Sequence, residues 1–84
     1  MEERDVYAEI QAFGEEPGNV GDAIKWQMKR VQIIREEYLS LPGGAGAFAA
    51  AGMQSSIHGA IDALANGDVL EILFWYESLK NWEL

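Results

Sequence analysis

The chain has 84 residues, which is too short for two hydrophobic cores, so a single domain over residues 1–84, helical as the patterns below indicate, is expected. It holds no cysteine, which excludes disulfides and thiolate metal sites, and its 49% hydrophobic residues argue against disorder. Fourteen acidic against six basic residues give a net charge of −8, which argues against nucleic acid and anionic lipid as partners because both are polyanions.

The N-terminal stretch MEERDVYAEI predicts the start of a first helix. It has several acidic side chains and no apolar run, so it matches neither a secretory signal nor an arginine-rich transit peptide, and we expect a cytoplasmic protein. Val6, Ile10 and Phe13 follow at helical spacing, and Gly14 precedes the turn-like EEPGN. These features predict a helix over residues 3–13.

The longest periodic stretch predicts a second helix over residues 20–40. Asn19 followed by Asp22 is a variant of the capping box that begins many helices. Pro42-Gly43-Gly44 ends the pattern, because proline lacks a backbone donor and glycine frees the chain. The apolar side chains step by threes and fours and draw one stripe: Val20, Ile24, Met28, Val31, Ile34, Tyr38 and Leu41.

The charge-free run GGAGAFAAAGMQSSIHGA, residues 43–60, admits several interpretations. It is too polar and too rich in glycine to span a bilayer, and its apolar residues fall at helical steps that a linker would not keep. Gly44-x-Gly46-x-x-Ala49 matches a relaxed dinucleotide-binding pattern, but no β-branched strand precedes it. We therefore expect a third helix over residues 46–65 and no bound cofactor.

Small residues at Gly52, Ser56 and Ala60 follow one another at steps of four along this helix. Because short side chains let a neighbouring backbone approach closely, the spacing predicts a buried, tightly packed helix. Asn66-Gly67 forms a good left-handed cap at its end.

The last segment, DVLEILFWYESLKNWEL, contains eight residues, VLEILFWY, that could also form a buried strand. No second strand-like run exists to pair with them, and Asp68 with Glu71 resembles a capping box, so a helix over residues 69–82 is expected. Leu70 and Phe74 lie on one flank of this helix, beyond the stripe that a core needs. Trp75 and Trp82, a heptad apart, lie on the other flank.

Residues that could carry chemistry are few. Ser55, Ser56 and His58 lie close in sequence, but they lack the strand-turn-helix setting of a serine nucleophile and a third orienting group. His58 and Asp62 share a helix face and could supply half of a metal site, although two ligands do not make a site. We expect no catalytic and no metal site.

Basic residues concentrate on the second helix, at Lys25, Lys29, Arg30 and Arg35, as in a DNA-recognition helix. Without these four, the net charge of the chain falls from −8 to −12, which would repel phosphates. The sequence therefore favours an ordinary solvated helix face.

Acidic and tryptophan side chains form the predicted partner-binding surface. Aligned carboxylates suit a basic partner, although full DNA mimicry would need roughly 18 charges over about 30 Å. Trp26 lies off the main stripe of the second helix, and tryptophan is enriched in binding hot spots. Core filling is the competing explanation for the tryptophans. For the acids it is a solubilising surface with favourable charge at a helix N-terminus. The predicted binding set is Glu2, Asp5, Glu9, Glu15, Glu16, Trp26, Trp75 and Trp82.

Together these features predict an all-α compact bundle of three to four helices that binds another protein and is not an enzyme. In size, acidity and lack of catalytic motifs the chain resembles small phage-encoded inhibitors of bacterial machinery, including anti-CRISPR proteins. This resemblance implies an inhibitor that occludes a basic groove of a nucleic-acid-handling protein. The alternative is a homo-oligomeric structural or adaptor protein, for example a homodimer, that self-associates through its aromatic C-terminal helix.

Overall fold

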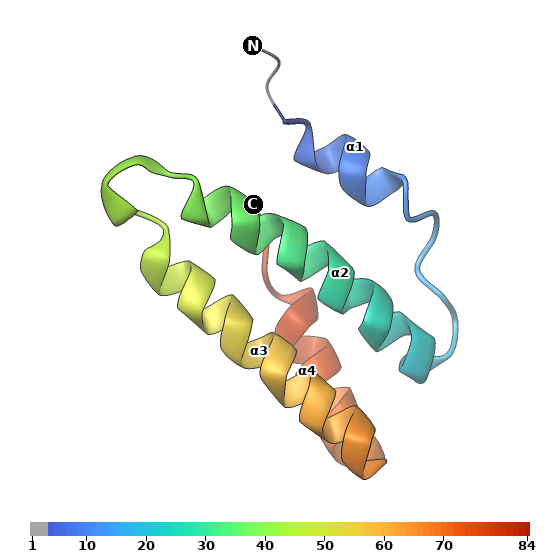
Figure 1. Ribbon diagram of the computed structural model, residues 1–84. Helices are drawn as coiled ribbons and strands as arrows, with labels where there is room; N and C mark the ends of the chain where they lie inside the picture. The colour runs from blue at the N-terminus through green and yellow to red at the C-terminus, as the bar shows by residue number, and fades with distance from the viewer. Residues whose placement is uncertain (1–3) are drawn as a thin grey trace.

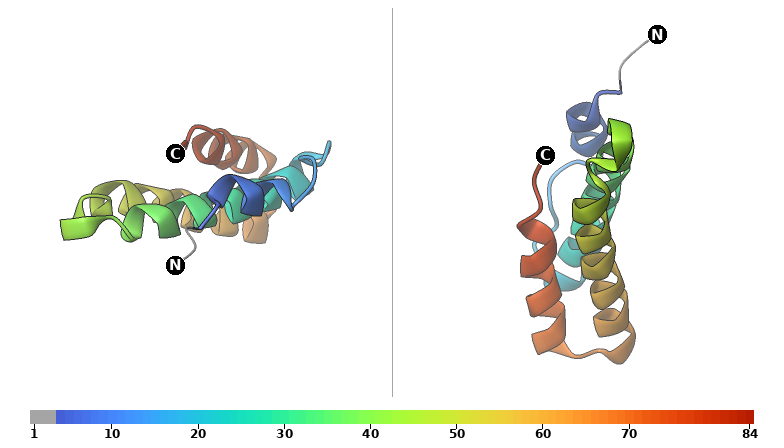
Figure 2. Two further views of the ribbon diagram at one scale, coloured as in Figure 1. Left: turned by 90° about the horizontal axis from the view of Figure 1, so that it is seen from above. Right: turned by 90° about the vertical axis from the view of Figure 1, so that its left-hand side faces the viewer.

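The computed structural model describes residues 4–84, which fold as helices without a strand, so the prediction of an all-α bundle is confirmed. The helices of this part of the chain are α1 (Val6–Gln11), α2 (Val20–Leu39), α3 (Ala47–Asn66) and α4 (Val69–Lys80), with a short 3-10 turn, Pro42–Gly44, between α2 and α3. In Figure 1, α2 and α3 lie side by side, α1 lies beside α2, and α4 lies behind. Figure 2 shows the same arrangement from above, with α4 forming a layer of its own.

Helix ends follow the expected caps. Asp5, Asn19 and Asp68 are the N-caps of α1, α2 and α4, and each side chain accepts a hydrogen bond from a backbone N–H of the first turn. α1 begins at Val6 and not at residue 3, because Asp5 has extended backbone angles and acts as the cap. α3 ends at Gly67 in the left-handed conformation (φ 65°).

The predicted stripe of α2 faces the core, where α2, α3 and α4 pack against one another. Its last member, Leu41, lies beyond the helix and is exposed, because the chain turns at Pro42. The buried side chains of the core are Ile24, Val31 and Ile34 from α2, Met53, Ile57, Ala60 and Ala63 from α3, and Ile72 and Leu79 from α4.

The glycine-rich run that opens the third segment is a tight turn between α2 and α3. Gly43 and Gly44 have φ values of 67° and 72°, which side chains other than glycine rarely adopt. Gly46 lies so close to the last turn of α2 that a Cβ there would overlap the backbone carbonyl of Tyr38. Backbone geometry therefore accounts for these glycines.

Candidate functional site: the surface of α4

Glycines of α3 receive two tryptophans, Trp75 of α4 and Trp82 just after the end of α4. Trp75 and Trp82 are partly buried, and a Cβ at Gly59 or Gly52 would overlap the Trp75 or Trp82 indole, respectively. Ser56 lies between the two glycines and accepts a hydrogen bond from the Trp82 indole N–H (3.1 Å). The two glycines are seven residues apart, and so are the two tryptophans. Because the chain reverses direction after α3, Gly59 lies opposite Trp75 and Gly52 lies opposite Trp82.

This packing of the Trp75 and Trp82 indoles on Gly52, Ser56 and Gly59, which we call the seam, corrects two expectations from the sequence. The small residues that face α4 are Gly52, Ser56 and Gly59, whereas Ala60 lies in the core, and they admit indole rings and not a bare backbone. Trp75 and Trp82, expected to be exposed, are partly buried because the glycines leave room for them. The shared seven-residue spacing was the signal in the sequence that could have revealed this packing.

Trp26 packs against the segment that follows α1. Its ring meets that of Phe13 edge to face, with centroids 6.2 Å apart, and it is partly buried. Its position off the main stripe of α2 is explained by this contact, because the stripe faces α3 and α4 while Trp26 meets Phe13, two residues after the end of α1. The structure gives Trp26 a packing role, and its role in binding a partner stays a prediction.

Two of the N-terminal acids in the predicted binding set have partners within the fold, while Glu2 lies outside the described residues. Asp5 caps α1. The carboxylate of Glu9 accepts a hydrogen bond from Arg4 (Nη2 to Oε1, 2.9 Å), and Arg4 also pairs with Glu36 (3.0 Å). The hydrogen bond from Arg4 lowers the pKa of Glu9. These carboxylates are therefore engaged in local structure.

Glu16 links the loop before α2 to two helices. Its Oε1 accepts hydrogen bonds from the Gln27 amide (2.8 Å) and from the Tyr76 hydroxyl (2.9 Å). Burial, and next the bond to Glu16, raises the pKa of Tyr76. Glu15, its neighbour, is exposed. Of the predicted acids, Glu15 is therefore the one most available to a partner among those the structure describes.

The basic residues of α2 have different roles. Lys25 and Lys29 are exposed, as expected for a solvated face. Arg30 instead turns toward the end of α4, where its Nη2 donates to the backbone carbonyls of Leu79 (3.0 Å) and Trp82 (2.8 Å), and burial lowers its pKa. A cation is favourable there because the C-terminal carbonyls of a helix carry partial negative charge. The expectation of a solvated face is wrong for Arg30.

The candidate chemical residues of α3 do not converge. Ser56 is buried and shares a hydrogen bond with Ser78 (2.8 Å), while Ser55 and His58 are exposed. The His58 ring contacts the Gln54 amide (2.7 Å), one turn away. Within residues 4–84, no three or more His, Cys, Asp or Glu side chains group so that they could hold a metal ion.

The outer face of α4 is apolar and nothing in the described part of the chain covers it. Four large side chains are exposed there: Val69 (61%), Leu70 (79%), Leu73 (44%) and Phe74 (62%). On the opposite side of the same helix, Ile72 is only 8% exposed. We call Val69, Leu70, Leu73 and Phe74 the outer α4 face. An apolar group of this kind on a small protein is typical of an interaction site.

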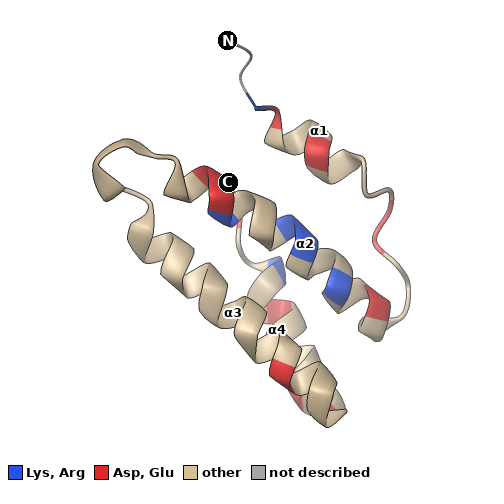
Figure 3. Cartoon of the chain, viewed as in Figure 1, with Lys and Arg blue, Asp and Glu red and all other residues tan. Residues whose placement is uncertain are grey.

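The charges near the outer α4 face are negative. Between Arg35 and Lys80 the sequence holds no lysine or arginine, and the hairpin of α3 and α4 carries Asp62, Asp68, Glu71 and Glu77. Figure 3 shows red segments and no blue along this hairpin until the end of α4. The surroundings of the apolar face therefore favour a positively charged partner.

A groove borders the outer α4 face on one side. It encloses about 470 Å³ between α4, the N-terminal part of α2 and the loop before α2. The lining residues are Glu16, Pro17, Gly18, Val20, Ala23, Leu73 and Tyr76. Leu73 belongs to both the groove and the outer α4 face, so the two form one continuous surface.

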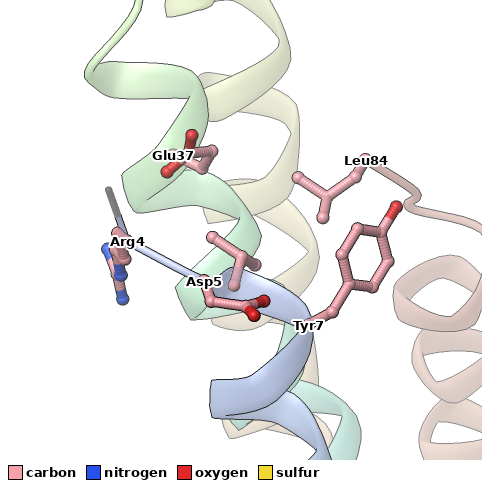
Figure 4. A pocket seen from close by; sticks show the side chains of 6 residues that line it. Arg4, Asp5, Tyr7, Glu37 and Leu84 are labelled. Atoms are coloured by element: carbon pink, nitrogen blue, oxygen red, sulfur yellow. The ribbon is translucent and has the colours of Figure 1, made fainter. Parts of the chain in front are cut away.

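A second cavity, of about 420 Å³, lies at the opposite end of α2. Figure 4 shows Tyr7 and Leu84 side by side across it, with Asp5 and Glu37 on the other side. Asp5 is committed to capping α1, and the Arg4 guanidinium is paired with Glu9. Asp5 and Arg4 therefore serve the local fold, and Glu37 is the remaining charged side chain that lines the cavity.

Comparisons with protein families, with curated proteins and with solved structures find no match to this chain. Among the described residues, no helix combines the length and the apolar character that crossing a bilayer requires.

Proposed function

We propose that the protein is a non-catalytic binding module that docks on a positively charged surface of another protein through the outer α4 face. One observation carries this proposal: four large apolar side chains of α4 are exposed in a hairpin whose only charges before Lys80 are carboxylates. Apolar contact supplies affinity in such an interface, and the surrounding charge supplies selectivity and a faster encounter.

The partner that this charge pattern suits best is a nucleic-acid-handling protein, since such proteins carry basic grooves for phosphates. The protein would then be an inhibitor that occludes such a groove, as the resemblance to phage-encoded inhibitors implies, and would work in the cytoplasm. A net charge of −8 supports attraction to such a groove. Relative to the sequence-based prediction, the proposal moves the centre of the interface from the tryptophans to the outer α4 face.

Affinity capture from a nuclease-treated lysate of the source cells tests the proposal. We expect the wild-type chain to retain a basic protein, with retention falling as salt rises. The double variant Leu70→Ser/Phe74→Ser should lose that protein. Phe48→Ser is the matched control, because Phe48 is 93% exposed and lies at the far end of α3. Equal capture by all three baits would refute the proposal.

A homo-oligomeric adaptor is the second candidate, and the same exposed apolar face favours it. Light scattering on the purified chain separates the two. A monomer agrees with a foreign partner, whereas a stable oligomer that Leu70→Ser dissociates would establish self-association.

A further inference from the structure

The surface formed by the outer α4 face and its groove has features that select one kind of binding element. α4 is hydrogen-bonded along its own backbone, and the described chain has no strand, so a partner cannot bind by adding a strand to a sheet edge. Leu70, Leu73 and Phe74 are spaced three and four residues apart, which forms a ridge on the helix surface. Such a ridge fits between the side-chain rows of a second helix.

We infer that this surface receives an amphipathic helix that carries Lys and Arg and belongs to a protein partner. This inference rests on the proposed function and names the partner element for the same site. The apolar side of that helix would lie along Leu73 and over Val20 and Ala23 in the groove. It would extend the bundle of α2, α3 and α4 by one helix, which is a common way for helical proteins to bury an apolar stripe.

Charge favours a foreign basic helix over a second copy of this chain. Glu16 lines the groove, and Asp68 and Glu77 are exposed residues at the start and in the last part of α4. In a symmetric dimer through this face, the same patch of net negative charge would lie on both sides of the interface. Lysines and arginines of a foreign helix that face these carboxylates would make the charges of the two surfaces complementary.

Lys80 limits the acidic surface at the end of α4. Its ammonium lies 5.9 Å from the centre of the Tyr76 ring, which borders the groove. The basic side chains of the partner helix would therefore concentrate near Asp68, at the end of α4 opposite Lys80. This arrangement gives the bound helix a preferred position.

A designed peptide probe tests the inference. We would titrate the full chain into a fluorescein-labelled 18-residue peptide with leucine on one helix face and lysine on the other, and follow fluorescence anisotropy. We expect binding that Leu73→Ser weakens about tenfold or more, since truncation of a central interface residue has effects of that size. Glu77→Lys should weaken binding and reduce its salt dependence. Phe48→Ser is the matched control that should bind like the wild type.

A scrambled peptide of the same composition controls for charge alone. If it binds as tightly as the helical peptide, or if Leu73→Ser has no effect, the inference is wrong. A dimer in light scattering that Leu70→Ser dissociates would assign the surface to a second copy and overturn it as well. Circular dichroism should show that each variant keeps the wild-type helix content.

The two proposals fail in different ways. If lysate capture depends on Leu70 and Phe74 but the helical peptide does not bind, the partner element is not a helix, and the proposed function stands. If capture does not depend on these residues, the proposed function and this inference both fall.

Discussion

The two sides of α4 are made of similar residues but have opposite environments. On the inner side, Trp75 lies against Gly59 of α3 and Leu79 is fully buried, while Trp82, just beyond the helix end, lies against Gly52. On the outer side, Leu70 and Phe74 are equally apolar and remain exposed. Burial therefore depends on what the neighbouring helix offers, here the space left by missing side chains, and not on hydrophobicity alone.

Removing an inner aromatic should have the largest effect on stability. We expect Trp82→Ala to lower the free energy of unfolding by about 3 kcal/mol, because it opens a cavity against α3 and removes the hydrogen bond to Ser56. Leu70→Ala, on the outer side of α4, should change it by less than about 0.5 kcal/mol. Urea unfolding followed by circular dichroism measures both. Similar losses of unfolding free energy in the two variants would contradict the difference in burial between the two sides.

Filling the seam should have the next largest effect. Gly59→Ala places a Cβ inside the space of the Trp75 indole, so we expect a net loss of about 1–2 kcal/mol despite the better helix propensity of alanine. In the first turn of α2, Gly21→Ala meets no atom closer than 3.7 Å and should instead be stabilising by up to about 1 kcal/mol. Thermal unfolding of the two variants gives the comparison. A stabilising Gly59→Ala would contradict the packing of Trp75.

Hydrogen bonding within the seam should have a moderate effect. Ser56→Ala leaves the Trp82 N–H and the Ser78 hydroxyl without their common partner, and we expect a loss of about 1 kcal/mol. Ser55→Ala, one residue earlier and exposed, is the matched control and should have no measurable effect. Chemical unfolding with tryptophan fluorescence measures both variants.

The smallest effect concerns the border between the two sides, where Tyr76 bonds to Glu16. The pKa of Tyr76 is raised in the folded state, mainly by burial, so folding favours the neutral phenol. Its contribution to stability is complete below the ordinary tyrosine pKa of about 10 and declines as pH rises through the folded pKa. Tyr76→Phe should therefore lose stability less steeply than the wild type above about pH 10. Parallel slopes in pH-dependent unfolding would contradict this assignment.

Local signals in the sequence determined most of the secondary structure. The caps at Asn19, Asp68 and Gly67 and the long stripe of α2 placed the ends of α2, α3 and α4 within two residues of their observed positions. These features act between residues less than a turn or two apart, so the sequence alone encodes them.

Tertiary structure alone decided which residues are free to meet a partner. The sequence named Glu9, Glu16, Trp75 and Trp82 as a binding surface, yet their side chains contact Arg4, Gln27 and the glycines of α3. It placed Leu70 and Phe74 on a separate flank of the last helix but did not assign them to the surface that binds. Composition and periodicity fix which side of a helix is apolar, whereas exposure depends on contacts between segments far apart in the chain.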